Sequence, residues 1–340
     1  MKAARIEDGQ VHVRVVPVPE PGVDEALVRI NAAGVCHSDL HLARGDWLGM
    51  RPEAIGHEAI GVVEALGPGA ERFVAVGDRV ILGLGGTGGS SWCGACEFCL
   101  TGQPRHCPES KGIMGVFAEQ FTVWARSLVT LPDSVGDEEA PLACGGLTAY
   151  GAVTKLLKHQ VLPGRRVAIV GAAGGLGHYA VQMATAFGYR VVGVDIGEER
   201  LEFVRSLGAE LAVGADEAIE VVEGLGGVDA SIVFSARLAG FDLGLKLLRR
   251  GGLFVAVGMP ATSEGNLQIN PFEFFMKDPT LVYSAVGNVQ DMREVVELAA
   301  SGKVKTHVSR VGGLTELGDI LDELEAGSYL GRAVITDLAG

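Results

Sequence analysis

The chain has 340 residues, of which 48% are hydrophobic and 21% charged, and its formal net charge is −14 at pH 7. This length favours two domains, and the acidic balance argues against a protein that binds the phosphate backbone of nucleic acids. The first residues lack the apolar segment of a signal peptide, and no run of 18 uncharged apolar residues follows. We therefore expect a cytoplasmic protein without a membrane partner.

The first 130 residues predict a β-rich, barrel-like domain. Short apolar or alternating runs are separated by glycine and proline, which is the pattern of strands joined by loops that carry function. The predicted strands are Val11–Val15, Ala26–Ile30, Ile60–Glu64, Arg79–Leu82 and Gln120–Trp124. A glycine-rich run, residues 83–89, then leads towards a cluster of cysteines.

Cys36, His57 and the distant Cys144 carry metal-ligand chemistry. Two thiolates and one imidazole make a three-ligand zinc site with an open fourth position, the arrangement of catalytic zinc. Spacing alone leaves a second interpretation equally open, in which Cys36 is a small buried hydrophobe and His57 a core histidine.

The remaining four cysteines, Cys93, Cys96, Cys99 and Cys107, predict a structural zinc site. Their Cys-x-x-Cys spacing suits a closed tetrahedral shell of four thiolates with no room for substrate. Disulfides would need an oxidising compartment, which nothing else in the sequence supports. Four unligated surface thiols are the other alternative, and they would leave reactive groups exposed without benefit.

From Pro163 the pattern changes to strands that alternate with helices. Val167–Val170 is uniformly apolar, as expected of a parallel strand covered on both faces, and a helix follows over residues 176–187. Five more strands are predicted at Val191–Val194, Leu211–Val213, Ser231–Phe234, Leu253–Val257 and Leu281–Ser284. Together they predict a doubly wound sheet. A helix over residues 291–300 and a strand over residues 332–336 follow, and we expect this strand to return to the first domain.

The run Gly171–Gly177, between the first of these strands and its helix, predicts a dinucleotide-binding turn. Glycines let a pyrophosphate approach the helix N-terminus, where N–H groups and the helix dipole favour negative charge. Asp195 ends the next strand, and it would bind the adenosine ribose hydroxyls and repel a 2′-phosphate, which favours NAD over NADP. Ala172 departs from the strict pattern, and in a glycine-rich chain a chance match is the alternative.

Five motifs, taken in order, resemble those of the zinc-dependent medium-chain alcohol dehydrogenases. They are Gly34–His41, Gly56–Glu58, the four-cysteine segment, Cys144–Thr148 and Gly171–Gly177. This resemblance covers essentially the whole chain. It implies an α/β fold in which a Rossmann doubly wound parallel sheet is inserted into a GroES-like β-barrel catalytic domain. The implied domains are residues 1–146 with a structural-zinc lobe at 93–107, a Rossmann NAD-binding domain at 147–287, and a C-terminal return at 288–340.

The resemblance also implies a role for individual residues. Cys36, His57 and Cys144 would hold the catalytic zinc, Glu58 would be a transient ligand, and Asp39 would orient His57. Ser38 and His41 would relay the proton, and Ser38 and Trp47 would line the substrate pocket. The implied cofactor contacts are His37, Thr148, Gly174, Gly175, Leu176, Gly177, Asp195, Val257 and Gly258. Thr148 would also lie at the nicotinamide, among the catalytic residues. Val289 stands where many members carry an arginine to the pyrophosphate.

The leading hypothesis is an NAD-dependent zinc alcohol dehydrogenase with two zinc ions per subunit, assembled as a homotetramer or homodimer. It would interconvert small to medium primary or secondary alcohols with aldehydes or ketones. One alternative is a polyol or aromatic-alcohol dehydrogenase of the same family, although polyol enzymes often carry a carboxylate at the position of Cys144. Another is a zinc-stabilised binding protein without catalysis, against which Ser38 and His41 argue because a proton relay serves only turnover.

Overall fold

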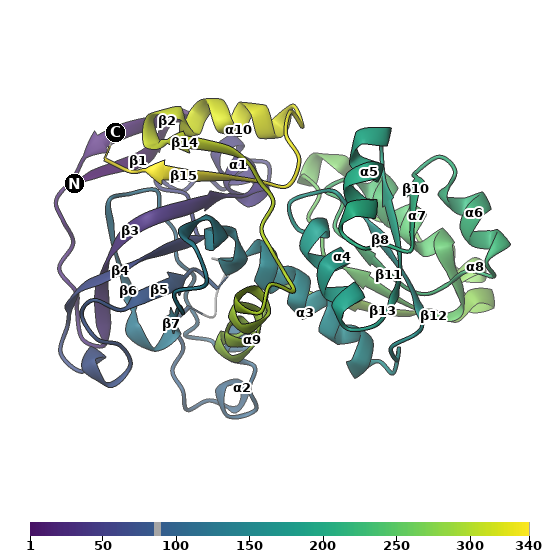
Figure 1. Cartoon of the computed structure of the whole chain (residues 1–340), viewed down its shortest axis with the longest axis horizontal. Helices are drawn as coiled ribbons and strands as arrows, with labels where there is room; N and C mark the ends of the chain where they lie inside the picture. Colours follow the sequence, from purple (N-terminus) through teal and green to yellow (C-terminus); the bar gives the residue numbers. More distant parts are fainter. Residues whose placement is uncertain (85–89, 340) are drawn as a thin grey trace. The chain divides into compact units, whose positions relative to one another are not determined.

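The structure is a computed structural model that describes residues 1–84 and 90–339. Residues 85–89, most of the glycine-rich run noted in the sequence, lie outside the described residues (Figure 1). The chain forms two compact units, one made of Met1–Leu147 with Gly287–Gly340 and the other of Thr148–Val286. The second unit is therefore an insertion in the first. In the part of the chain that the structure describes, no helix is long and apolar enough to cross a membrane.

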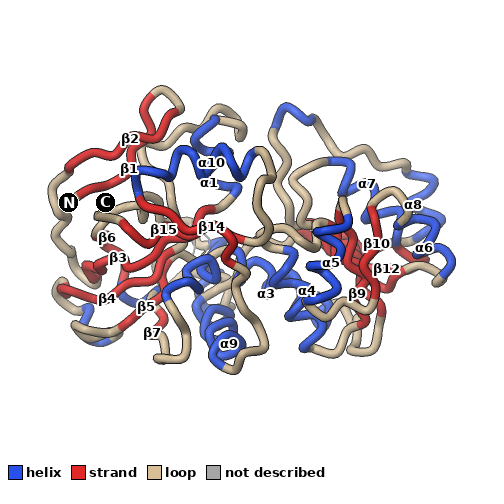
Figure 2. Tube along the Cα trace, turned by 45° about the horizontal axis from the view of Figure 1, so that its top comes forward, coloured by secondary structure: helices blue, strands red, loops and turns tan. Residues whose placement is uncertain are grey.

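The second unit contains a six-stranded parallel sheet, which confirms the predicted doubly wound fold. Figure 2 shows β9, β10 and β12 of this sheet with helices around them. Its strands are β8 (Arg166–Val170), β9 (Arg190–Asp195), β10 (Leu211–Gly214), β11 (Val228–Val233), β12 (Leu248–Ala256) and β13 (Thr280–Tyr283). They are arranged in the order β10-β9-β8-β11-β12-β13. Strands β11 and β12 begin earlier than predicted, because their first halves carry polar residues such as Asp229 and Arg249 that hide the apolar pattern.

Helices lead into this sheet and connect its strands. They are α3 (Gly145–Lys158), which leads into the second unit, α4 (Gly177–Ala186), α5 (Glu198–Ser206), α6 (Ala218–Gly224), α7 (Leu238–Leu247) and α8 (Pro271–Lys277). Helices α4 and α5 pack on β8, β9 and β10, whereas α7 packs on β8, β11 and β12. Right-handed crossovers place α4 and α5 on one face and α6 to α8 on the other. The strand order reverses between β8 and β11, so Gly171, directly after β8, lies at the switch point where such folds bind ligands.

The described part of the first unit contains two sheets, in which all strand pairs are antiparallel except β14 with β15. Strands β1 (Lys2–Glu7) and β2 (Gln10–Val15) form a hairpin. The larger sheet contains β3 (Glu25–Val35), β4 (Ala59–Leu66), β5 (Arg79–Leu82), β6 (Gln120–Trp124), β7 (Val129–Thr130), β14 (Val308–Gly313) and β15 (Arg332–Asp337). The long β3 pairs with β4, β6 and β15. Strand β15 pairs with β3 in the first unit, where both termini lie near each other (Figure 1). The sequence did not predict β1, β7 or β14.

The described residues of the first unit also form the helices α1 (His37–Arg44), α2 (Glu97–Leu100), α9 (Val289–Ala300) and α10 (Leu317–Glu325). A 3₁₀ segment, Asp137–Ala143, runs from the sheet to α3. Within it, the carboxylate of the buried Glu139 accepts hydrogen bonds from the backbone N–H and the hydroxyl of Thr306. This contact ties the 3₁₀ segment to the part of the chain that follows the inserted unit.

The buried Glu139 makes stability depend on pH. Burial raises the pKa of this carboxyl above its usual 4.5, and the hydrogen bonds from Thr306 offset this only in part. Because the pKa is higher in the folded than in the unfolded protein, the contribution of Glu139 to stability is complete below pH 4.5 and is lost as pH rises through the raised value. We predict that Glu139→Gln removes this loss. The urea midpoint of Glu139→Gln, relative to that of the unmodified protein, should therefore rise between pH 4.5 and pH 8.

Glu20 is exposed and is not among the groups that shift the pKa of Glu139, so Glu20→Gln is the control and should leave the pH dependence as it is. Parallel pH profiles for Glu139→Gln and the unmodified protein would contradict the prediction.

Candidate active site and metal centres

The carboxylate of Asp39 organises the start of α1. Cys36 is the N-cap of this helix, and its backbone N–H donates to Asp39 Oδ2 at 3.0 Å. The other carboxylate oxygen, Oδ1, accepts the backbone N–H of Gly56 at 2.9 Å and lies 3.0 Å from Nδ1 of His57. Asp39 is fully buried. One side chain thus holds two candidate metal ligands, Cys36 and His57, although 20 residues of chain separate them.

His57 presents its second ring nitrogen to the buried cluster. Because Nδ1 is hydrogen-bonded to Asp39, Nε2 is the nitrogen available to a metal. Nε2 is buried and has no hydrogen-bond partner among the residues that the structure describes. A buried nitrogen without a partner is costly, and a metal ion would satisfy it.

The structure brings Cys36, His57, Glu58 and Cys144 together. One potential ligand atom from each lies within 4.8 Å of the others, and all four residues are buried. Cys144 reaches this place because it ends the 3₁₀ segment Asp137–Ala143, directly before α3. Two sulfurs, one imidazole nitrogen and a carboxylate suit zinc, so these residues fit the ion that the sequence predicted.

The protonation of this cluster shows why a cation stabilises it. The hydrogen bond with Cys144 lowers the pKa of Cys36 well below its usual range, and the same bond raises the pKa of Cys144. This hydrogen bond therefore favours a thiolate at Cys36 and a protonated thiol at Cys144. Burial lowers the pKa of His57, but the Asp39 carboxylate and the negative charge of Cys36 together outweigh this effect, and the pKa lies well above its usual range. A divalent cation would replace both protons, since ligand thiols and imidazoles bind metal in their deprotonated forms.

Glu58 is held by a partner that the sequence analysis missed. Its carboxylate forms a buried ion pair with Arg332, whose Nη2 also donates to Val35 O at 2.9 Å. Burial raises the pKa of Glu58 to about 7, although the charge of Arg332 lowers it. A single arginine at the start of the apolar strand β15 was the only signal in the sequence. Gly34 is required here, because a Cβ atom would collide with Glu58 Oε2.

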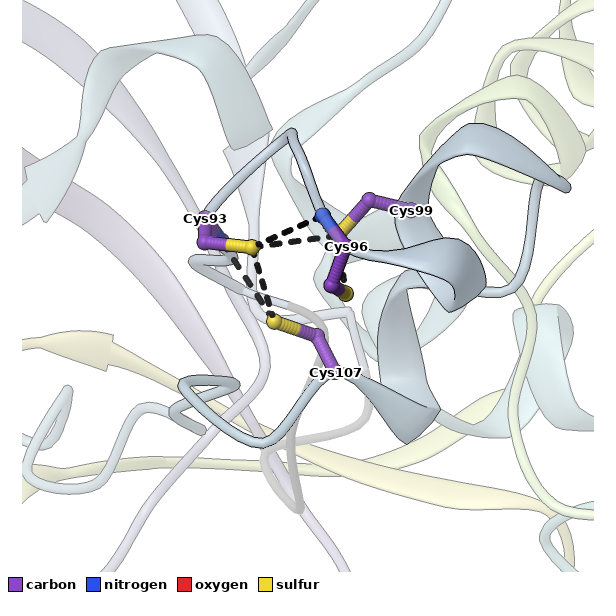
Figure 3. A group of neighbouring side chains, drawn as sticks. All are labelled: Cys93, Cys96, Cys99 and Cys107. Carbon is purple, nitrogen blue, oxygen red and sulfur yellow. Dashed lines mark hydrogen bonds between the residues drawn. The ribbon is translucent and has the colours of Figure 1, made fainter.

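The four clustered cysteines also meet, as Figure 3 shows. Their Sγ atoms lie 3.5 Å apart for Cys96 and Cys99, 3.6 Å for Cys93 and Cys107, and 4.0 Å for Cys93 and Cys99. None of the six cysteines forms a disulfide. Backbone N–H groups of Ala95 and Cys96 donate to Cys93 Sγ and lower its pKa to about 7, whereas burial raises that of Cys99 to about 12. The arrangement fits the predicted structural zinc site.

Ser38 and His41 lie one turn apart on α1 and therefore share a face of the helix. Ser38 Oγ is 3.7 Å from Cys36 Sγ, which places a hydroxyl beside the buried candidate metal ligands. Trp47, the predicted pocket residue, is buried and its ring centroid lies 4.8 Å from that of His41. His37 is exposed, and its ring lies 6.3 Å from that of His41.

The predicted dinucleotide turn joins β8 to α4 in the second unit. At Gly177 a Cβ atom would collide with the backbone of Gly171 and Ala172, so the tight turn needs glycine there. Asp195 ends β9, and its Oδ2 accepts the backbone N–H of Ala173 at 2.7 Å. The carboxylate therefore lies at the turn, as a residue that binds the ribose must. The donor set and the close backbone approach fit a dinucleotide.

The other residues that the sequence predicted to contact the cofactor lie on several elements. Thr148 is buried on α3, and Val257 and Gly258 follow β12, where the backbone N–H groups of both donate to Val233 O on β11. Leu176 is the N-cap of α4. Val289 is the first residue of α9.

Comparison with known proteins agrees with this architecture. Residues 22–133 match the model of the alcohol dehydrogenase GroES-like domain, and residues 175–301 match that of zinc-binding dehydrogenases. An alcohol dehydrogenase from Geobacillus stearothermophilus is 40% identical over 98% of this chain and 99% of its own length.

Two solved structures cover nearly the whole chain. The alcohol dehydrogenase of Aeropyrum pernix is 35% identical with a TM-score of 0.89, over 99% of this chain and 100% of that one. The acetophenone reductase of Geotrichum candidum, solved in complex with NAD, is 28% identical with a TM-score of 0.84. The match covers 99% of this chain and 97% of that one. With its two zinc-type ligand groups and its inserted doubly wound unit, this chain belongs to the zinc-dependent medium-chain alcohol dehydrogenase family.

Proposed function

We propose that the protein is an NAD-dependent zinc alcohol dehydrogenase that converts primary or secondary alcohols to aldehydes or ketones. One observation carries this proposal: the buried group of Cys36, His57 and Cys144 is oriented by Asp39 and has the Ser38 hydroxyl beside it. A closed structural site has no use for a neighbouring hydroxyl, whereas an open catalytic site needs a group that takes the alcohol proton.

Each residue at this site then has a part in the reaction. Cys36, His57 and Cys144 would hold a zinc ion, which supplies Lewis-acid chemistry and lowers the pKa of a bound hydroxyl. Asp39 orients the imidazole of His57 and supports Cys36 through its backbone N–H. Arg332 holds the Glu58 carboxylate beside the ligands, where Glu58 can act as a transient ligand. Ser38 accepts the alcohol proton, and His41 passes it towards solvent.

The second unit would bind NAD. The turn after β8 offers backbone N–H groups to a pyrophosphate, and the carboxylate of Asp195 suits the adenosine ribose hydroxyls. The complex of the Geotrichum candidum reductase with NAD supports this choice of cofactor. We assign Thr148, Val257 and Gly258 to the nicotinamide end by the same family pattern, with His37 and the turn residues at the pyrophosphate.

We also propose two zinc ions per chain and a homodimer or homotetramer. The cysteine tetrad supports the second zinc. An exposed apolar surface supports association: β13 is an edge strand with exposed Leu281 and Tyr283, and α8 exposes Phe272 and Phe275.

A panel of alcohols tests the function. NADH formation should be measured with alcohols of graded chain length and branching, together with polyols and aromatic alcohols. The proposal predicts turnover of simple alcohols, and Cys36→Ala should abolish it in a protein that is still folded. Turnover of polyols alone would favour the alternative member of the family, and no turnover with any alcohol or carbonyl compound would contradict the proposal.

The choice between NAD and NADP should depend on Asp195. A 2′-phosphate beside its carboxylate would add repulsion between like charges in a partly desolvated site. We predict that Asp195→Gly lowers the ratio of kcat/KM for NAD to that for NADP by about 10-fold or more. The ratio is the relevant measurement, since the variant also loses the hydrogen bond from Ala173 and so weakens binding of both cofactors. Equal use of NAD and NADP by the unmodified enzyme would show that Asp195 does not have this role.

The two residues of the relay should differ in importance. Ser38 lies next to the metal ligand Cys36, where water cannot easily replace it, whereas His41 is the outer member. Ser38→Ala should therefore slow alcohol oxidation by ~10²–10⁴-fold, the usual range for proton transfer by a side chain, and His41→Gln should cost less. The rate of NADH formation in a single turnover measures both. Unaltered turnover in Ser38→Ala would mean that the proton leaves by another path.

A further inference from the structure

The end of α1 brings an acidic side chain back onto His41. The helix ends at Gly45, which adopts a left-handed conformation with φ of 75° and ψ of 27°. The backbone N–H groups of Gly45 and Asp46 both donate to His41 O. A side chain at position 45 would be strained, and its Cβ would lie 2.6 Å from Arg51 Nε. This turn places Asp46 Oδ2 at 2.8 Å from His41 Nδ1.

Besides this contact with Asp46, packing and burial restrict the imidazole of His41. Trp47 packs against the ring, and the side chain of His41 is only 11% exposed. Its other nitrogen, Nε2, is buried without a hydrogen bond to any residue in the described ranges 1–84 and 90–339. The ring centroid of His37 lies 6.3 Å from that of His41. The acidic residues of α10 that face α1, Asp322 and Glu325, are paired with Arg44 instead.

We propose that Asp46 is a positioning residue for proton transfer by His41, an inference that rests on the proposed function. A carboxylate on one imidazole nitrogen fixes the tautomer, as in Ser-His-Asp triads. Here Asp46 holds the hydrogen of His41 on Nδ1, so that Nε2 presents its lone pair. Nε2 accepts the alcohol proton from Ser38, and the Asp46 carboxylate pairs with the imidazolium that forms. Because Nε2 is buried, it releases the same proton only when water reaches it as the product leaves. The Nδ1 hydrogen stays in place throughout.

The simpler alternative is that Asp46 only closes the helix end. In that case its loss would disturb α1 as a whole and would act independently of His41. A positioning role predicts the reverse: the effect of Asp46 on the rate requires the imidazole of His41, and the tautomer of His41 requires Asp46. These two outcomes can be measured separately.

The tautomer is measured by long-range proton–nitrogen NMR of the zinc-loaded, full-length protein labelled with ¹⁵N-histidine, without cofactor or substrate. His41→Gln assigns the signals. We expect a single Nδ1–H tautomer in the unmodified protein and a mixture in Asp46→Asn. Asp322→Asn is the matched control, because it removes an acidic partner of the same helix and should leave the His41 signals in place. If the Nδ1–H tautomer stayed fixed in Asp46→Asn, the proposal would be overturned.

The rate is measured as single-turnover NADH formation in Asp46→Asn, His41→Gln and the double variant. We expect Asp46→Asn to slow the reaction by no more than His41→Gln does, the double variant to be no slower than His41→Gln alone, and Asp46→Glu to recover part of the rate. If the rate reductions of Asp46→Asn and His41→Gln multiplied in the double variant, the two residues would act independently. This result would overturn the role of Asp46 and leave the relay intact. Full activity of His41→Gln would remove His41 from the relay, and the positioning role with it.

Discussion

The hydrogen bonds of the Asp39 carboxylate hold together the cluster of candidate metal ligands, which comprises Cys36, His57, Glu58 and Cys144. Its two oxygens accept the backbone N–H groups of Cys36 and Gly56 and pair with the ring of His57, and the carboxylate is fully buried. A buried carboxylate is costly unless its oxygens are satisfied, so its partners are confined to one geometry. That geometry directs a thiol and the Nε2 nitrogen of His57 towards a common point. Cys144 then needs only to end its 3₁₀ segment there.

Around this cluster the fold places groups whose arrangement suits a reaction better than it suits stability. Glu58 and Arg332 form a buried pair beside the ligands, and buried pairs contribute little net stability. His41 lies one turn after Ser38 on α1, and Asp46 follows the end of the helix. The Nε2 nitrogen of His41 is buried. A protein that used zinc only for structure would gain nothing from these groups, and its cysteine tetrad would suffice. The arrangement thus favours turnover over a zinc-stabilised binding protein.

Much of this architecture could be predicted from the sequence, for identifiable reasons. Apolar runs such as Val167–Val170 and the glycine turn after them mark the doubly wound sheet, and ligand spacing marks the cysteine tetrad. The role of Arg332 could not be predicted, because it pairs with Glu58 across 274 residues of chain and lies in a strand whose other residues follow the apolar pattern. Nor could the contact of Asp46 with His41, which depends on the left-handed turn at Gly45. Polar residues at the start of β12 likewise concealed half of that strand.

Zinc titration of the Asp39→Asn variant tests most directly whether this carboxylate organises the metal cluster. The unmodified protein should bind two zinc ions per chain, and Cys93→Ala should lose the one in the tetrad. In Asp39→Asn the tetrad should keep its zinc, while the affinity of the Cys36, His57 and Cys144 site should fall by about 10–100-fold, the usual cost of losing a hydrogen-bond partner of a metal ligand. Two results would contradict the account. One is that Asp39→Asn binds both zinc ions as tightly as the unmodified protein does, and the other is that the unmodified protein binds fewer than two.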